Sequence, residues 1–174
     1  MENAYFMGQA LVQAENALAH NEFPVGCVIV QHDRVIATGS RTGSSGPLPN
    51  EIDHAEMVAL RQLSLHSETV APETLRIFCT LEPCLMCFGA ILLNGIYEVV
   101  YAYEDIMGGG TACPTDTLPP LYRDRTIRIV PHVEREASLN LFQAYFANPD
   151  NRYWHGSLLA RYTLAQKPAS ADGP

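Results

Sequence analysis

Lysine is nearly absent from this 174-residue sequence: Lys167 is the only one, and lysine and arginine together number 11 against 19 acidic residues. The formal net charge of -8 opposes long-range attraction to a phosphate backbone. The nearest approach to a basic cluster is formed by Arg123, Arg125 and Arg128. The composition therefore disfavours a large nucleic-acid partner, although it does not exclude a local basic groove.

Long apolar runs are also missing, and cysteine is sparse. No run could span a bilayer, and the N-terminus is amphipathic, unlike the charged and then apolar pattern of a secretion signal. Five cysteines are too few for a disulfide framework in a chain of this length. We therefore expect a cytoplasmic protein without membrane contact. A hydrophobic content of 47% suits one domain with a sizeable core.

Hydrophobic periodicity predicts an alternation of helices and strands. The helices are expected over about 2–20, 53–63, 83–94, 134–147 and 153–166, and the strands over 25–30, 34–38, 75–80, 97–103 and 126–130. The stretches 41–52 and 107–120 are rich in Gly, Ser or Pro and are expected to be loops. Asp53 is the predicted N-cap of the second helix, with Glu56 at its third position, and Pro83 is predicted at the first position of the third helix.

This order of elements predicts an α/β fold. An N-terminal antiparallel hairpin would feed a five-stranded mixed sheet with helices on both faces, forming a three-layer α/β/α sandwich. We expect a single domain over residues 1–166, followed by a disordered tail over 167–174.

The most informative feature is a compound motif. His54-Ala55-Glu56 is followed, after twenty-six intervening residues, by Pro83-Cys84-Leu85-Met86-Cys87. One imidazole and two thiolates make a three-ligand zinc set, whereas structural zinc sites usually have four protein ligands. An open position with a carboxylate nearby favours water activation, and this spacing is the signature of zinc nucleobase deaminases.

The predicted helices make this ligand set geometrically feasible. Cys84 and Cys87, three residues apart, share one helical face, and a helix N-terminus stabilises thiolates. Zinc on His54, Cys84 and Cys87 would lower the pKa of its water towards about 7. Glu56 would carry protons from that water to the ring and to the amine that leaves as ammonia.

A structural reading of the same residues stays open. Cys113 or His132 could supply a fourth ligand, in which case Glu56 would only cap its helix. Cys27 and Cys79 lie in predicted strands, and we expect both to be buried core residues. A group of C-terminal aromatic residues could form a base-stacking surface, but packing of a helix is the interpretation we favour. These residues are Tyr145, Phe146, Tyr153, Trp154 and Tyr162.

At these motifs the chain resembles the cytidine/deoxycytidylate deaminase superfamily, and within it the bacterial tRNA adenosine deaminase and guanine deaminase branch. The likeness spans roughly residues 7–105 and includes the stretches 23–30, 54–61 and 80–91. It implies an α/β/α fold, zinc on the three ligands named above and Glu56 as proton shuttle. It also implies that the backbone near Ala55 and the Pro24-Val25 stretch help to form the base pocket, and that the protein is a homodimer.

Two departures from this branch bear on the substrate. The tRNA deaminases carry an asparagine that contacts the ribose, where this chain has Gly39-Ser40-Arg41-Thr42. After the fourth strand an Ala-Arg-Asp stretch with a following basic residue is replaced by the acidic and apolar stretch 102–107. We therefore expect a small aminated base or nucleoside as substrate, with Arg41, Asp53 and Asp105 as further contacts. A tRNA-specific adenosine deaminase and a non-catalytic zinc-stabilised binding module are the alternatives.

Overall fold

The computed structural model describes residues 2–65 and 70–166. The tail expected over 167–174 lies outside the described residues. The helices are α1 (Glu2–Ala19), α2 (Ala55–Ser64), α3 (Leu85–Leu93), α4 (Pro120–Arg123), α5 (Arg135–Ala147) and α6 (Leu158–Ala165), with short 3-10 turns η1 (Pro72–Thr74) and η2 (Thr115–Thr117). The strands are β1 (Gly26–Gln31), β2 (Arg34–Ser40), β3 (Leu75–Leu81), β4 (Glu98–Tyr103) and β5 (Arg128–Val130).

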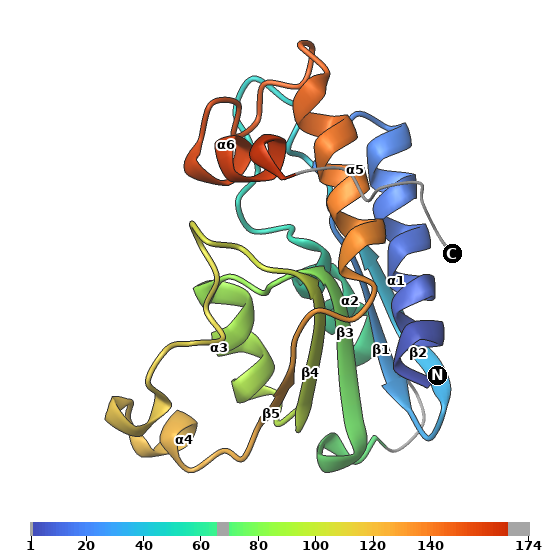
Figure 1. Ribbon diagram of the computed structural model, residues 1–174. Helices are drawn as coiled ribbons and strands as arrows, with labels where there is room; N and C mark the ends of the chain where they lie inside the picture. Colours follow the sequence, from blue (N-terminus) through green and yellow to red (C-terminus); the bar gives the residue numbers. More distant parts are fainter. Residues whose placement is uncertain (1, 66–69, 167–174) are drawn as a thin grey trace, which may run out of the picture.

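The five strands form one mixed sheet in the order β2-β1-β3-β4-β5 (Figure 1). β1 is antiparallel to both β2 and β3, whereas β3, β4 and β5 run parallel. The N-terminal hairpin feeding a mixed sheet is therefore confirmed, and so is the α/β class. None of the described helices combines the length and the apolar character needed to cross a bilayer.

Both faces of the sheet are covered, which explains the continuous apolar run of β1. Cys27 and Ile29 belong to the core cluster that includes the buried face of α2, while Val28 and Val30 pack with Phe6 and other residues of α1. Figure 1 shows α1 and α5 side by side along one flank of the sheet and α3 on the opposite flank. A strand buried on both faces needs no polar alternation.

The predicted starts of the helices α2 and α3 are wrong. His54, not Asp53, is the N-cap of α2, because the Asp53 carboxylate is taken by the side chains of Asn50 and Arg61. Glu56 is consequently the second helical residue. Cys84, not a residue before Pro83, is the N-cap of α3.

The last helix also begins later than predicted. Ser157 is the N-cap of α6, and its hydroxyl accepts a hydrogen bond from the backbone N–H of Ala160. Residues 153–156 therefore form a turn instead of a first helical turn, with Trp154 and Gly156 at φ values of 58° and 68°. This turn lies between α5 and α6, and it brings aromatic side chains onto the functional site described next.

Candidate metal centre and substrate cavity

The starts of two helices bring the predicted metal ligands together. His54 and Cys84 are the N-caps of α2 and α3, and both have extended backbone with ψ values of 153° and 171°. Neither side chain caps its own helix. Both can therefore point beyond the helix ends, where Cys87 joins them from the first turn of α3.

The distances within this group suit a tetrahedral zinc ion. The His54 Nδ1 atom lies 3.5 Å from the Sγ atoms of both Cys84 and Cys87. A nitrogen at about 2.0 Å and a sulfur at about 2.3 Å from one tetrahedral ion lie about 3.5 Å apart. Over residues 2–65 and 70–166 this is the one group of at least three His, Cys, Asp or Glu ligand atoms found within 4.8 Å of one another. The residues present therefore fit zinc.

Electrostatics within the group favour a thiolate at Cys84. Hydrogen bonding with Cys87, followed by the hydrogen bond with His54, lowers the pKa of Cys84 to about 4. The pKa of Cys87 is raised, first by the same hydrogen bond with Cys84 and then by burial. The positive end of the α3 dipole adds to the stability of a thiolate at this position.

Glu56 lies beside the ligands and is almost fully buried. Its Oε2 atom has no hydrogen-bond partner among the described residues. Burial is the main cause that raises the pKa of this carboxyl group. A buried carboxyl group with a raised pKa and an oxygen that has no hydrogen-bond partner is suited to take up and release a proton.

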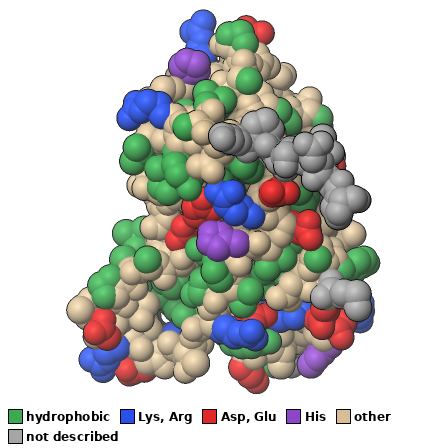
Figure 2. Space-filling view, viewed as in Figure 1, with side chains coloured by type: hydrophobic (Ala, Val, Ile, Leu, Met, Phe, Trp, Pro, Cys, Tyr) green, Lys and Arg blue, Asp and Glu red, His purple; other side chains and the backbone are tan. Residues whose placement is uncertain are grey.

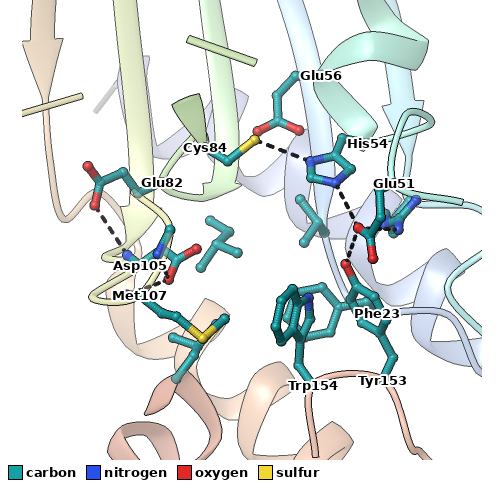
Figure 3. A pocket seen from close by; sticks show the side chains of 15 residues that line it. Phe23, Glu51, His54, Glu56, Glu82, Cys84, Asp105, Met107, Tyr153 and Trp154 are labelled. Carbon is teal, nitrogen blue, oxygen red and sulfur yellow. Dashed lines mark hydrogen bonds and ion pairs between the residues drawn. The ribbon is translucent and has the colours of Figure 1, made fainter. Parts of the chain in front are cut away.

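The metal-binding group forms one side of a cavity of about 190 Å³. Phe23, Tyr153 and Trp154 line it together with His54 and Glu56. Figure 3 shows Tyr153 and Trp154 on the side of the cavity opposite Cys84 and Glu56. Two flat, aromatic surfaces so placed can hold a planar ring against the metal centre.

A second side of the cavity is acidic. Glu82 and Asp105 both line it, but Glu82 is occupied, since its carboxylate accepts hydrogen bonds from Asp105 N–H and from the backbone and hydroxyl of Thr111. Asp105 Oδ1 accepts from the N–H groups of Met107 and Gly108, each at 2.9 Å. Glu82 therefore supports the loop that carries Asp105, which is itself a lining residue of the cavity.

Apart from His54, Arg41 is the one basic side chain among the described residues that line the cavity, and it is 2% exposed. Its Nη1 donates to the carbonyl oxygens of Thr42 and Asp53 at 2.7 and 3.0 Å. Its Nη2 has no hydrogen-bond partner among the described residues, but it lies at ion-pair distance, 3.7 Å, from Glu51 Oε2. The guanidinium group lies over the Tyr153 ring, 5.4 Å from the centroid. A buried N–H group without a hydrogen-bond partner can donate to a ligand.

The structure brings together some of the predicted substrate contacts and not others. Val25, Arg41 and Asp105 line the cavity, whereas Pro24, Asp53 and Ala55 do not contribute to its lining. Ala55 is buried at the start of α2 and Asp53 is held by Arg61. Asp53 acts on the cavity only indirectly, through the carbonyl oxygen that accepts from Arg41.

The proposed fourth ligands of a structural zinc site are absent from the ligand group. Neither Cys113 nor His132 belongs to it; His132 Nδ1 instead lies 3.4 Å from Glu104. Cys27 and Cys79 are fully buried and free, with their sulfurs 3.9 Å apart across β1 and β3, so their prediction as core residues is confirmed. The described geometry leaves the metal group with the open position expected of a catalytic site.

Sequence reasoning missed several cavity residues. The packing interpretation is right for Tyr145 and Phe146, which are buried, and incomplete for Tyr153, which packs against the core and also lines the cavity; it is wrong for Trp154, an exposed lining residue. The serine N-cap at Ser157 was the available signal that this pair precedes the last helix. Glu51 was missed because it lies in an irregular loop, where no periodicity reports the direction of a side chain.

Comparisons with known proteins agree with this site. The family model for the cytidine and deoxycytidylate deaminase zinc-binding region matches residues 1–103. A tRNA-specific adenosine deaminase of Streptococcus pyogenes is 34% identical over 149 residues, covering 83% of this chain and 90% of that protein. One of Aquifex aeolicus is 34% identical over 110 residues, covering 63% of this chain and 72% of that protein.

Solved structures share the fold. A structure from a study of A-to-I editing by tRNA:A34 deaminases is 28% identical, with a TM-score of 0.65, and covers 79% of this chain and 98% of its own. The guanine deaminase from Nitrosomonas europaea is 24% identical, with a TM-score of 0.64, and covers 83% of this chain and 85% of its own. The second likeness shows the fold alone.

These matches, together with a His/Cys/Cys group that fits zinc, identify the class of enzyme. The family model spans more than half of the chain, and it contains both halves of the ligand motif. The chain belongs to the cytidine and deoxycytidylate deaminase zinc-binding family and is a zinc-dependent hydrolase of the deaminase type.

Proposed function

We propose that this deaminase acts on a small aminated nucleobase or nucleoside. In this proposal His54, Cys84 and Cys87 hold the zinc ion and Glu56 transfers protons. The observation that carries it is the cavity of about 190 Å³ beside the ligand group, lined across from it by the aromatic turn between α5 and α6. Pockets for drug-sized ligands usually measure about 300–1,000 Å³, so this one suits a smaller molecule such as a single base.

The reaction replaces an exocyclic amino group by oxygen and releases ammonia, with water as the second substrate. Zinc, when bound, supplies a water molecule of lowered pKa as the nucleophile. Glu56 would accept one proton of the attacking water and give it to a ring nitrogen, and would then carry the other proton of that water to the amine, whose C–N bond breaks as the carbonyl bond forms. Its burial supports this role, because a raised pKa lets the carboxyl group both accept and release a proton.

The remaining cavity residues orient the ring in this proposal. Phe23, Tyr153 and Trp154 supply flat apolar contacts. Arg41 Nη2 offers a donor for a ring nitrogen or carbonyl oxygen, and the carboxylate of Asp105, a lining residue, offers an acceptor for a ring N–H or amino group. A donor, an acceptor and aromatic faces around one cavity match the edge and the faces of a base.

The charges of the molecule favour a small substrate over a polyanion. The cavity is lined by Glu51, Glu82 and Asp105, and its cation Arg41 is already engaged by backbone carbonyl oxygens. Figure 2 shows one face of the molecule, on which basic side chains are scattered and several lie beside acidic ones. Salt-dependent phosphate binding needs several basic groups along one path.

The experiment is a panel of free bases, nucleosides, nucleotides and bulk tRNA, with ammonia release measured for the zinc-loaded protein. A Glu56→Gln variant with the same zinc content serves as the blank. Release of ammonia from one small molecule, lost in the variant, is the expected result. Turnover of tRNA alone would overturn the small-molecule proposal.

A tRNA-specific adenosine deaminase is the second candidate. It is favoured by the relatives with that name, which are 34% identical over much of their length. For this function we expect inosine in tRNA and a binding affinity that falls steeply as salt rises, because each phosphate contact releases counterions.

Membership of the deaminase family argues against the third alternative, a non-catalytic zinc-stabilised module. A homodimer remains a prediction from the resemblance, and a cytoplasmic location remains a prediction from the composition.

A further inference from the structure

Glu51 connects the metal centre with the aromatic turn. Its Oε2 atom lies 3.7 Å from His54 Nε2 and accepts a hydrogen bond of 2.8 Å from the hydroxyl of Tyr153. Figure 3 shows the resulting chain of contacts, which runs from Cys84 through His54 and Glu51 to Tyr153. Glu51 and Tyr153 are 102 residues apart in the sequence, so only the fold brings them together.

The orientation of His54 makes the Glu51 contact consequential. Nδ1 faces both thiolates, which leaves Nε2 as the nitrogen that carries the hydrogen. Nε2 is buried and has no hydrogen-bond partner among the described residues, and Glu51 Oε2 is its ion-pair neighbour. A ligand histidine usually donates its second N–H to a carboxylate, which fixes the ring and its tautomer.

The turn that carries Tyr153 has a defined shape. Trp154, at a φ of 58°, accepts at its carbonyl oxygen from the N–H of Ser157, and Arg161 donates to the carbonyl oxygen of Gly156. The Tyr153 ring lies against the guanidinium of Arg41, while its hydroxyl reaches Glu51. One tyrosine thus contacts the cation of the cavity and the carboxylate next to the metal ligand.

We propose that Glu51 is a positioning residue for the metal ligand His54, and that Tyr153 makes this positioning depend on closure of the 153–156 turn over the cavity. The inference rests on the proposed zinc ligands. Glu51 orients the imidazole, and the Tyr153 hydroxyl holds Glu51 in place when the turn is closed. Opening of the turn removes the hydrogen bond from Tyr153 to Glu51 Oε2 and leaves the more distant ion pair with Arg41 Nη2 at 3.7 Å, so the ligand geometry is weakened when the cavity opens.

The test measures the metal centre itself. Zinc release to a chromogenic chelator is followed for the wild-type protein and for Glu51→Ala, Glu51→Gln and Tyr153→Phe, and the visible spectrum is recorded after Co²⁺ replaces zinc. We expect Glu51→Ala to weaken zinc binding about tenfold. Residues that orient a metal-binding histidine usually contribute about 10- to 100-fold to metal affinity, and Glu51 should lie at the lower limit because it is half exposed. Glu51→Gln, which keeps an oxygen acceptor, should restore part of this loss.

A double-variant cycle tests the coupling. If Tyr153 acts through Glu51, Tyr153→Phe should speed zinc release in the wild-type background and have no added effect in Glu51→Ala. Tyr162→Phe and Glu136→Gln are matched controls: the Tyr162 hydroxyl donates to Glu104, outside the cavity, and Glu136 is exposed on α5. Both should release zinc at the wild-type rate.

The outcomes separate the two proposals. Wild-type protein that binds zinc and deaminates a substrate, but whose Glu51 and Tyr153 variants have unchanged release rates and Co²⁺ spectra, would overturn this inference alone. Additive effects of the two substitutions would overturn the coupling through Glu51. Wild-type protein that takes up no zinc would overturn the proposed ligands and this inference with them.

Discussion

Gly39 of β2 and Ala55 of α2 approach so closely that a β-carbon on Gly39 would lie 2.0 Å from the carbonyl oxygen of Ala55 and 2.8 Å from the backbone nitrogen of Ala59. No side chain can move aside there, because the neighbours are backbone atoms. The absence of a side chain at Gly39 therefore sets how near the first turn of α2, which follows His54 and contains Glu56, lies to the sheet.

The first prediction follows from this contact. Gly39→Ala should destabilise the protein by about 1–3 kcal/mol or more, as overpacking of a close-packed interior does. It should also lower activity, because α2 must shift. Gly89→Ala is the matched control: it lies in α3 with nothing within 4 Å of an added β-carbon, and should stabilise by about 0.5–1 kcal/mol. Urea denaturation measures both, and equal effects of the two substitutions would refute the argument.

Glu56→Gln tests the proton transfer. The substitution keeps the shape of the buried side chain but removes its ability to accept a proton, so kcat should fall by about 10²- to 10⁴-fold. Zinc content, measured by atomic emission, should stay at the wild-type level. Glu136→Gln on the exposed side of α5 should leave kcat unchanged. Retained activity in Glu56→Gln would remove this residue from the mechanism.

Cys84→Ser tests the metal assignment. Serine is a poorer zinc ligand, so we expect loss of zinc and a lower melting temperature. A zinc ion whose free concentration is about a thousand times its Kd stabilises the folded protein by about 4 kcal/mol, and this stabilisation is lost with the ion. Chelator should lower the melting temperature of the wild-type protein and have little further effect on the variant. A variant with full zinc content and a normal melting curve is the contrary result.

Trp154→Ala tests the aromatic wall. If the substrate ring contacts this side chain, KM should rise by about tenfold or more, since stacking of a base on an aromatic residue contributes about 1–3 kcal/mol. Trp154→Phe should recover most of the loss because it keeps an aromatic face. An unchanged KM in Trp154→Ala, measured with the small molecule that the panel identifies, would place the substrate elsewhere in the cavity.

The ion pair of Glu104 with Arg135 predicts a pH dependence of stability. Burial alone would raise the pKa of Glu104, but the hydrogen bonds from Arg135 and Tyr162 lower it to about 2. Between its ordinary value of 4.5 and about 2, the unfolded chain binds more protons at this residue than the folded one. The contribution of Glu104 is therefore complete above the ordinary pKa and is lost as pH falls towards 2.

Thermal melts from pH 6 down to pH 2 measure this contribution. Glu104→Gln should be less stable than the wild-type protein at pH 6, and the difference should shrink as the pH falls through this window. The size of the effect is limited by solvent screening, because the pair is only partly buried. A difference that stays constant over the whole range would show that Glu104 does not carry it.

The chemistry of the metal centre could be read from the sequence. His54, Cys84 and Cys87 were identified because ligand chemistry depends on residue type and on short spacings, and the spacing of Cys84 and Cys87 needs only one helical turn to act. The class of fold followed from the alternation of apolar stretches, which reports burial directly. Helix starts were less predictable, since Asp53 had all the properties of an N-cap and was instead taken by Arg61 and Asn50.

The sequence by itself determined the deaminase motif and the mixed sheet, because both depend on patterns within a few residues. Only the tertiary structure decided what surrounds the metal group. Tyr153 meets Glu51 across 102 residues, and Arg41 meets the carbonyl oxygen of Asp53 and the ring of Tyr153. Such contacts arise where a turn after α5 folds back over a loop before α2, and no local periodicity encodes the direction in which an irregular segment returns.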